Sequence, residues 1–172
     1  MPNVVQLDLL PASSNRLAHL KATQLSPDEQ EHVIELALEV LNRRYQPGYL
    51  IDRPDRMRDY LRLRLSEREH EIFAVAFLDN RHRVLLFEEL FRGTIDGCSV
   101  YPRVILQMAM KVNAAAVVLA HNHPSSVPDP SQADLNITRK IREALTLVDI
   151  RVLDHFILTR QSVLSFAESG LL

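Results

Sequence analysis

Apolar positions along the chain recur with two different periods, and each period predicts one kind of element. Apolar residues three and four apart predict helices at 27–44, 52–65 or 54–65, 101–112 and 132–147. Continuous or alternating apolar runs predict strands at 71–79, 84–93, 115–120, 150–158 and 163–166. This order predicts an α/β fold in which a mixed central sheet is sandwiched by helices.

The N-terminal part is predicted to be separate, with an arm and one helix at 1–49 ahead of a domain at 50–172. The arm shows no sustained period, so no function is assigned to it. The helix begins with a Ser26 cap, Pro27 at its first position and Glu29 three residues after the cap. Its apolar stripe must pack on something. We expect it either to cover the domain or to form a homodimer seam.

Composition places the chain among ordinary globular proteins, because 47% of its residues are apolar and 24% are charged. The longest uninterrupted apolar run, at 114–120, is too short to cross a bilayer, and the N-terminus lacks the pattern of a secretory signal. The single cysteine, Cys98, permits no internal disulfide. We therefore expect a cytoplasmic protein with no membrane partner.

Charge gives no global sign of nucleic-acid binding, since the net charge is -2 and the pI is near 6.4. A local cluster is more basic, and it runs from Arg53 to Arg64. These arginines could bind the phosphates of DNA. More often such a run is the solvated side of a helix, paired with acidic neighbours such as Asp55 and Asp59.

The apolar run at 115–120 is followed by His121, Asn122 and His123. Because side chains alternate faces along a strand, His121 and His123 point the same way and can converge on one ion. Asp134 lies in the first turn of the next predicted helix, from which it can reach the strand end. Two imidazoles and one carboxylate leave a fourth tetrahedral position open, which is typical of a catalytic zinc site. The competing interpretation is that Ser131 and Asp134 only cap the helix.

The spacing of these residues resembles the JAMM (MPN+) metalloprotease signature, which it reproduces without a gap. Four further segments resemble the RadC branch of that superfamily: EELFRGT at 88–94, SVYPR at 99–103, HNHPS at 121–125 and VLDH at 152–155. The resemblance covers roughly residues 50 to 172 and implies a cytidine-deaminase-like α/β fold. One departure is Ser126, where the RadC pattern has glycine. If that position needs a positive φ, we expect serine to be mildly strained there.

The resemblance also implies the roles of further residues. Glu71 occupies the position of the general base, ahead of a buried strand, with Glu69 and the pair Glu88 and Glu89 as alternatives. Ser131 is implied to polarise the oxygen that develops charge, unless its role is only the helix cap.

Two other polar residues near the motif are expected to be structural. Asn122 should point away from the two histidines and serve as a hydrogen-bonding residue. His155 is expected to be a core or supporting histidine and not a fourth ligand. The cap of the helix at 101–112 is expected to be Ser99.

Together, these observations predict a zinc-dependent hydrolase, most naturally a peptidase or isopeptidase that acts on a peptide or protein substrate. The alternative is a DNA repair or recombination protein, a description that the RadC branch carries. In that case Arg53 to Arg64 would be the feature that contacts DNA. The substrate itself is not readable from the sequence.

Overall fold

A computed structural model describes four segments of the chain, residues 21–44, 54–65, 68–93 and 99–172. Arg53, Cys98 and nearly all of the predicted arm therefore lie outside the described residues. By its contacts the chain divides into two units between Glu35 and Leu36, a boundary that falls inside a helix. The predicted division at 49/50 stays a prediction.

Helix α1 spans Pro27–Arg44, and its predicted start is confirmed. The Ser26 N–H donates to Glu29 Oε2 at 2.8 Å, and the Glu29 N–H donates to Ser26 Oγ at 3.4 Å. A short 3-10 helix, η1, precedes it at Ala22–Gln24. The surface on which the apolar stripe of α1 docks stays a prediction. None of the helices in the described segments combines the length and the apolar character that a membrane span requires.

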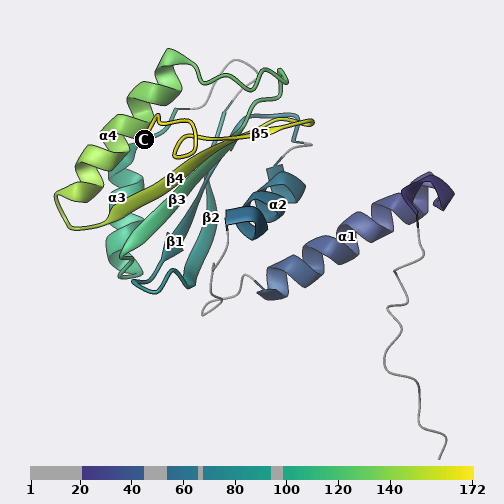
Figure 1. The fold of residues 1–172 in the computed structure, drawn as a ribbon. Coiled ribbons are helices and arrows are strands. Elements are labelled where there is room, and N and C mark those ends of the chain that lie inside the picture. The colour runs from purple at the N-terminus through teal and green to yellow at the C-terminus, as the bar shows by residue number, and fades with distance from the viewer. Residues whose placement is uncertain (1–20, 45–53, 66–67, 94–98) are drawn as a thin grey trace, which may run out of the picture. The chain divides into compact units, whose positions relative to one another are not determined.

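The second unit is built around one mixed sheet, which confirms the predicted α/β fold (Figure 1). Its strands lie in the order β2-β1-β3-β4-β5. Strands β3 and β4 are parallel, and the other neighbouring pairs are antiparallel. The strands span Ile72–Leu78 (β1), Val84–Arg92 (β2), Ala116–Asn122 (β3), Arg151–Leu158 (β4) and Val163–Ser165 (β5).

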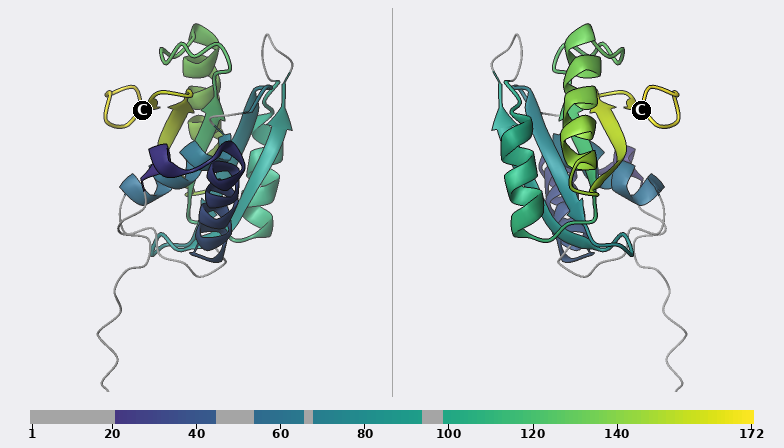
Figure 2. Two further views of the ribbon diagram at one scale, coloured as in Figure 1. Left: turned by 90° about the vertical axis from the view of Figure 1, so that its right-hand side faces the viewer. Right: turned by 90° about the vertical axis from the view of Figure 1, so that its left-hand side faces the viewer.

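Helices cover both faces of this sheet (Figures 1 and 2). Helix α2, Pro54–Leu65, packs on one face with buried residues such as Met57 and Leu61. Helices α3, Pro102–Lys111, and α4, Gln132–Thr146, pack on the other face. All residues of β1 and β3 are buried, because these strands lie inside the sheet and are covered on both faces.

The predicted cap of α3 is wrong. The helix begins at Pro102, and its N-cap is Tyr101, whose side chain makes no capping hydrogen bond. Ser99 lies two residues further upstream, outside the capping position. Proline fixes φ near the helical value and has no N–H that needs a partner, so Pro102 starts the helix without a polar cap.

The register between β1 and β3 decides which residues meet at the sheet edge. Phe73 of β1 lies opposite His121 of β3. The antiparallel pairing brings the start of β1 to the end of β3. Glu71, which precedes β1, and His123, which follows β3, are therefore neighbours on the face that carries α3 and α4.

Candidate metal centre

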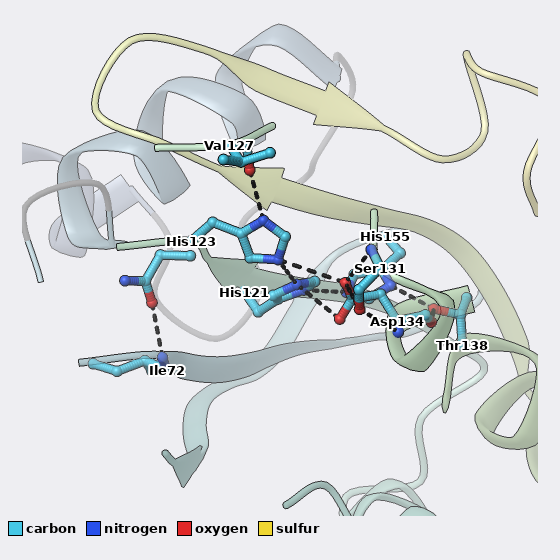
Figure 3. A network of polar contacts seen from close by, with 9 residues as sticks. Ile72, His121, His123, Val127, Ser131, Asp134, Thr138 and His155 are labelled. Atoms are coloured by element: carbon cyan, nitrogen blue, oxygen red, sulfur yellow. Dashed lines mark hydrogen bonds and ion pairs between the residues drawn. The ribbon is translucent and has the colours of Figure 1, made fainter. Parts of the chain in front are cut away.

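Three predicted ligands come together at the end of β3 (Figure 3). His121 and His123 project from one face of the strand end, and Asp134 reaches them from the first turn of α4. His121 Nε2 lies 2.9 Å from His123 Nε2 and 3.2 Å from Asp134 Oδ1. His123 Nε2 lies 3.5 Å from Asp134 Oδ2. These donors are spaced closely enough to hold one metal ion.

Backbone geometry brings Asp134 to the strand. The loop between β3 and α4 contains Pro124, Pro128 and Pro130, which restrict its conformations. Ser131 then caps α4, because its Oγ accepts from the Asp134 N–H at 3.1 Å. The helix therefore starts with the carboxylate of Asp134 already facing the two imidazoles.

Ser126 has a positive φ of 60° in this loop, as was expected if the position needs the left-handed region. A β-carbon in that region costs about 1–2 kcal/mol. We predict that Ser126→Gly raises the free energy of unfolding by about 1 kcal/mol, measured by urea denaturation. The neighbouring Ser125 is also exposed but does not have a positive φ. Ser125→Gly is therefore expected to lower stability slightly. Equal effects of the two changes would contradict the argument.

Asp134 is held in its charged form. Burial raises its pKa, but the neighbouring imidazoles of His121 and His123, which favour the carboxylate most when they are protonated, and the hydrogen bonds from Ser131 outweigh burial and bring the pKa well below the ordinary value. Ser131 contributes twice, because its N–H and its Oγ–H both donate to Asp134 Oδ2, at 2.7 and 2.6 Å. Ser131 is therefore a helix cap and a partner of the candidate ligand. Its action on a substrate oxygen stays a prediction.

His123 is oriented by the loop that follows it. Its Nδ1 lies 2.7 Å from the carbonyl oxygen of Val127. A carbonyl can only accept, so Nδ1 carries the proton, and Nε2 faces the other ligands. The hydrogen bond with Asp134 raises the pKa of His123, whereas its partial burial lowers it.

His121 is oriented from inside the protein. Its Nδ1 lies 2.8 Å from Nε2 of His155, which is fully buried on β4. The other nitrogen of His155 lies 2.7 Å from Oγ1 of Thr138 on α4. His155 thus contacts a candidate ligand and does not belong to the ligand group, in agreement with its predicted supporting role. Burial lowers the pKa of His155 well below its ordinary value.

Glu71 is half-buried beside this group. Burial is the main cause that raises its pKa, and the Asp134 carboxylate adds to the rise, while His121 and His123 act in the opposite direction. These interactions show that Glu71 lies within electrostatic reach of all three candidate ligands. Whether Glu71 acts as the general base stays a prediction.

Asn122 lies between the two histidines in sequence but serves the other face of the sheet. Its Oδ1 accepts from the Ile72 N–H at 2.8 Å, and its Nδ2 donates to the His70 carbonyl at 3.0 Å. This confirms its predicted role as a structural hydrogen-bonding residue. Asn122 ties the end of β3 to the residues on either side of Glu71.

The sequence did not reveal three partners of the ligands: the carbonyl of Val127, the hydroxyl of Thr138 and the ring of His155 as the partner of His121. The carbonyl belongs to a loop whose conformation has no side-chain signature. Thr138 carried a weak signal, because it lies four residues after Asp134 and so on the same face of the helix. His155 could be linked to His121 only through the pairing of β3 with β4.

Described arginines of the basic cluster hold α2 against the rest of its unit. Arg58 pairs with Glu168 at 2.6 Å, and Arg64 pairs with Glu89 at 3.4 Å. Arg53 lies outside the described residues. The cations of Arg58 and Arg64 are thus matched by carboxylates of the chain itself, and they give DNA binding no support.

Comparisons with known proteins agree with the fold. The family model described as RadC-like JAB domain matches residues 51–171. A UPF0758 protein of Vibrio cholerae is 56% identical over 147 residues, which cover 85% of this chain and 92% of that protein. One of Thioalkalivibrio sulfidiphilus is 50% identical over 170 residues, 98% of this chain and 74% of that protein.

A third relative shows that the chain spans part of some longer proteins. The UPF0758 protein of Methylibium petroleiphilum is 54% identical over 140 residues, which are 81% of this chain and 63% of that protein. The chain therefore matches less than two thirds of this relative's length.

Proposed function

The chain belongs to the RadC-like JAB domain family, and from that premise we propose that it is a zinc-dependent hydrolase of amide bonds, a peptidase or isopeptidase. The observation that carries this proposal is the group of His121, His123 and Asp134, with the half-buried Glu71 beside it. A metal centre that only stabilised the fold would have no use for a carboxyl group in this position.

The donor set fits zinc. Donors held tetrahedrally at about 2.0–2.1 Å from zinc lie about 3.3 Å from one another. The two Nε2 atoms lie 2.9 Å apart, and Asp134 lies 3.2 Å from His121 through Oδ1 and 3.5 Å from His123 through Oδ2. One donor atom from each residue lies within 4.8 Å of the other two. Imidazole nitrogens and a carboxylate oxygen are also donors that zinc accepts readily, and three protein ligands leave one position open.

In this proposal three side chains bind the metal ion, and Glu71 transfers the proton. Zinc, when bound by the three side chains, supplies a Lewis acid that makes water more acidic and a carbonyl more electrophilic. Glu71 accepts a proton from the attacking water and passes it to the leaving nitrogen as the carbon–nitrogen bond breaks. Half-burial suits this task, because the raised pKa of Glu71 makes its carboxylate a stronger base.

We expect two features of the described surface to contact a substrate. A cleft of about 400 Å³ is lined by Glu69, His70 and Ile72, which are neighbours of Glu71 in sequence, together with residues from β2; Glu71 and the three candidate ligands do not line it. A row of aromatic rings also leads from His121 towards the surface. Its ring centres are separated by 5.9, 6.2 and 6.1 Å along the order His121, Phe73, Phe91 and Tyr101, and Tyr101 is exposed.

The test combines metal analysis with an unbiased search for cleaved bonds. The purified chain, loaded with zinc, would be incubated in ¹⁸O-water with mixed peptides and lysine isopeptides, and new ¹⁸O-carboxylates would be detected by mass spectrometry. We expect about one zinc per chain and cleavage of an amide bond in at least one class. His123→Ala should lose both the bound zinc and the cleavage of amide bonds. Zinc binding without any cleaved amide, together with cleavage of single-stranded DNA in a parallel reaction, would overturn the peptidase proposal.

A further inference from the structure

A continuous line of hydrogen bonds runs from the backbone of α4 to the metal-facing edge of His121. Thr138 Oγ1 lies 2.6 Å from the Asp134 carbonyl oxygen and 2.7 Å from His155 Nδ1. His155 Nε2 lies 2.8 Å from His121 Nδ1. The three side chains in this line are 3% exposed or less. Figure 3 shows the line as dashed contacts on the far side of the ligands from Val127.

We propose that Thr138 and His155 are positioning residues that hold His121 in one tautomer, with its proton on Nδ1 and with Nε2 free to bind the metal ion. The inference rests on the proposed metal site, but it needs no particular substrate. It assigns a task in that site to two buried polar groups that take no part in the hydrolysis itself.

The direction of every proton follows from the carbonyl at one end. A carbonyl oxygen has no proton, so the single hydroxyl proton of Thr138 must lie in the 2.6 Å contact with Asp134. If that proton pointed elsewhere, two oxygen lone pairs would face each other at this distance. Oγ1 of Thr138 must therefore accept a proton from His155, which places a proton on His155 Nδ1.

The second half of the line follows from the burial of His155. Complete burial disfavours a charged imidazole, so this ring carries one proton, and that proton is already on Nδ1. Its Nε2 is then an acceptor, and the contact at 2.8 Å requires that His121 Nδ1 donates. When a metal ion is bound, the remaining nitrogen of His121 offers it a lone pair, and this is the atom that faces His123 and Asp134.

Apolar packing prevents other partners from breaking this line. Phe73 stacks on His121 with ring centres 5.9 Å apart and an interplanar angle of 12°. Phe166 lies against His155 with ring centres 4.7 Å apart. Both phenylalanines are 2% exposed or less. These rings exclude water from the nitrogens, so the hydroxyl of Thr138 decides the tautomer of His155, and His155 decides that of His121.

The arrangement also explains why the partner of His121 is an imidazole. Ligating histidines usually donate their second N–H to a carboxylate, a carbonyl or water. A carboxylate at this depth would place a second buried negative charge next to that of Asp134, which a neutral imidazole avoids. The cost is that a neutral imidazole has two tautomers and needs a further group, here Thr138, to select one.

The first test reads the proton positions directly in the unmodified protein. Nitrogen-15 NMR of the histidine rings, above neutral pH and without metal, should show protonated Nδ1 atoms in both His121 and His155 and an unprotonated Nε2 in His155. A proton on His155 Nε2 would overturn the proposal. The measurement requires neither zinc nor substrate. It therefore tests the proposed tautomers even if the protein has no hydrolase activity.

The second test removes the hydroxyl that selects the tautomer. Thr138→Val keeps the shape of the side chain and is expected to weaken zinc binding by about 10–100-fold and to shift the proton of His155 to Nε2. Thr138→Ser should restore both properties. The matched control is Thr146→Val, because Thr146 makes the same type of bond, to the Arg142 carbonyl at 2.8 Å, in the last turn of α4. Equal zinc affinity of Thr138→Val and Thr146→Val would overturn the proposal.

Discussion

Replacing Glu71 by glutamine is expected to lower kcat/KM for amide hydrolysis by about 10²- to 10⁴-fold while zinc remains bound. Glutamine has nearly the same shape as glutamate but cannot accept a proton from the attacking water. The three candidate ligands come from the end of β3, the residue that follows it and the first turn of α4, so their donors stay in place. The measurements are steady-state kinetics on the best substrate from the library and zinc content by mass spectrometry.

The control for this change is Glu69→Gln, because Glu69 was the alternative base closest in sequence. Glu69 is exposed and lines the cleft, whereas Glu71 is half-buried and interacts electrostatically with all three ligands. Glu69→Gln should therefore change kcat/KM by no more than a few fold. If the two variants lose activity equally, the base has been assigned to the wrong carboxylate.

The stability of Glu71→Gln provides a second, independent test of the role of Glu71. Burial raises the pKa of Glu71, so the folded metal-free protein takes up this proton at a higher pH than the unfolded chain does. The charged carboxylate thus opposes folding at neutral pH, and its contribution becomes less unfavourable as the pH falls through the raised pKa. Glu71→Gln is expected to raise the free energy of unfolding of the metal-free protein at pH 7. A purely structural residue would show a loss of stability instead.

The parts of the fold that follow from local periodicity could be predicted from the sequence. The apolar run that ends in His121 and His123 fixed both the strand and the common direction of the two imidazoles, since alternation along a strand is a local property. The capping residue Ser131 likewise located the start of α4 and hence Asp134. These two local patterns placed the three candidate ligands near one another, and the match to the JAMM spacing favoured a metal site over a helix cap alone.

The partners of the ligands depend on how distant segments align, and no local pattern contains that information. His155 lies 34 residues from His121 in sequence and meets it because β3 and β4 are parallel neighbours. The partners of the arginines on α2 were also not predictable from local patterns. Whether Arg58 faces solvent or Glu168 is decided by a contact across 110 residues. Periodicity places a side chain on a face, but the register between elements chooses its neighbour.

Replacing Asn122 by alanine is expected to lower the free energy of unfolding by about 2–4 kcal/mol. The change removes the acceptor of the buried Ile72 N–H and the donor to the His70 carbonyl, which are bonds of 2.8 and 3.0 Å. Each buried backbone group left without a partner costs about 1–3 kcal/mol. Urea denaturation of the metal-free protein measures the loss. Asn136→Ala is the matched control, because the Asn136 amide bonds only to Gln132 and Arg139 among the described residues.

The position of these two bonds predicts how Asn122→Ala divides its effect between metal binding and hydrolysis. His70 and Ile72 flank Glu71, so Asn122 fixes the backbone on both sides of the proposed base. The ligands are held separately, His123 by Val127 and His121 by His155. We therefore expect kcat to fall by at least tenfold, while zinc affinity changes only a few fold. A variant that lost zinc and kept kcat in its metal-loaded fraction would show that Asn122 supports the ligands and not the base.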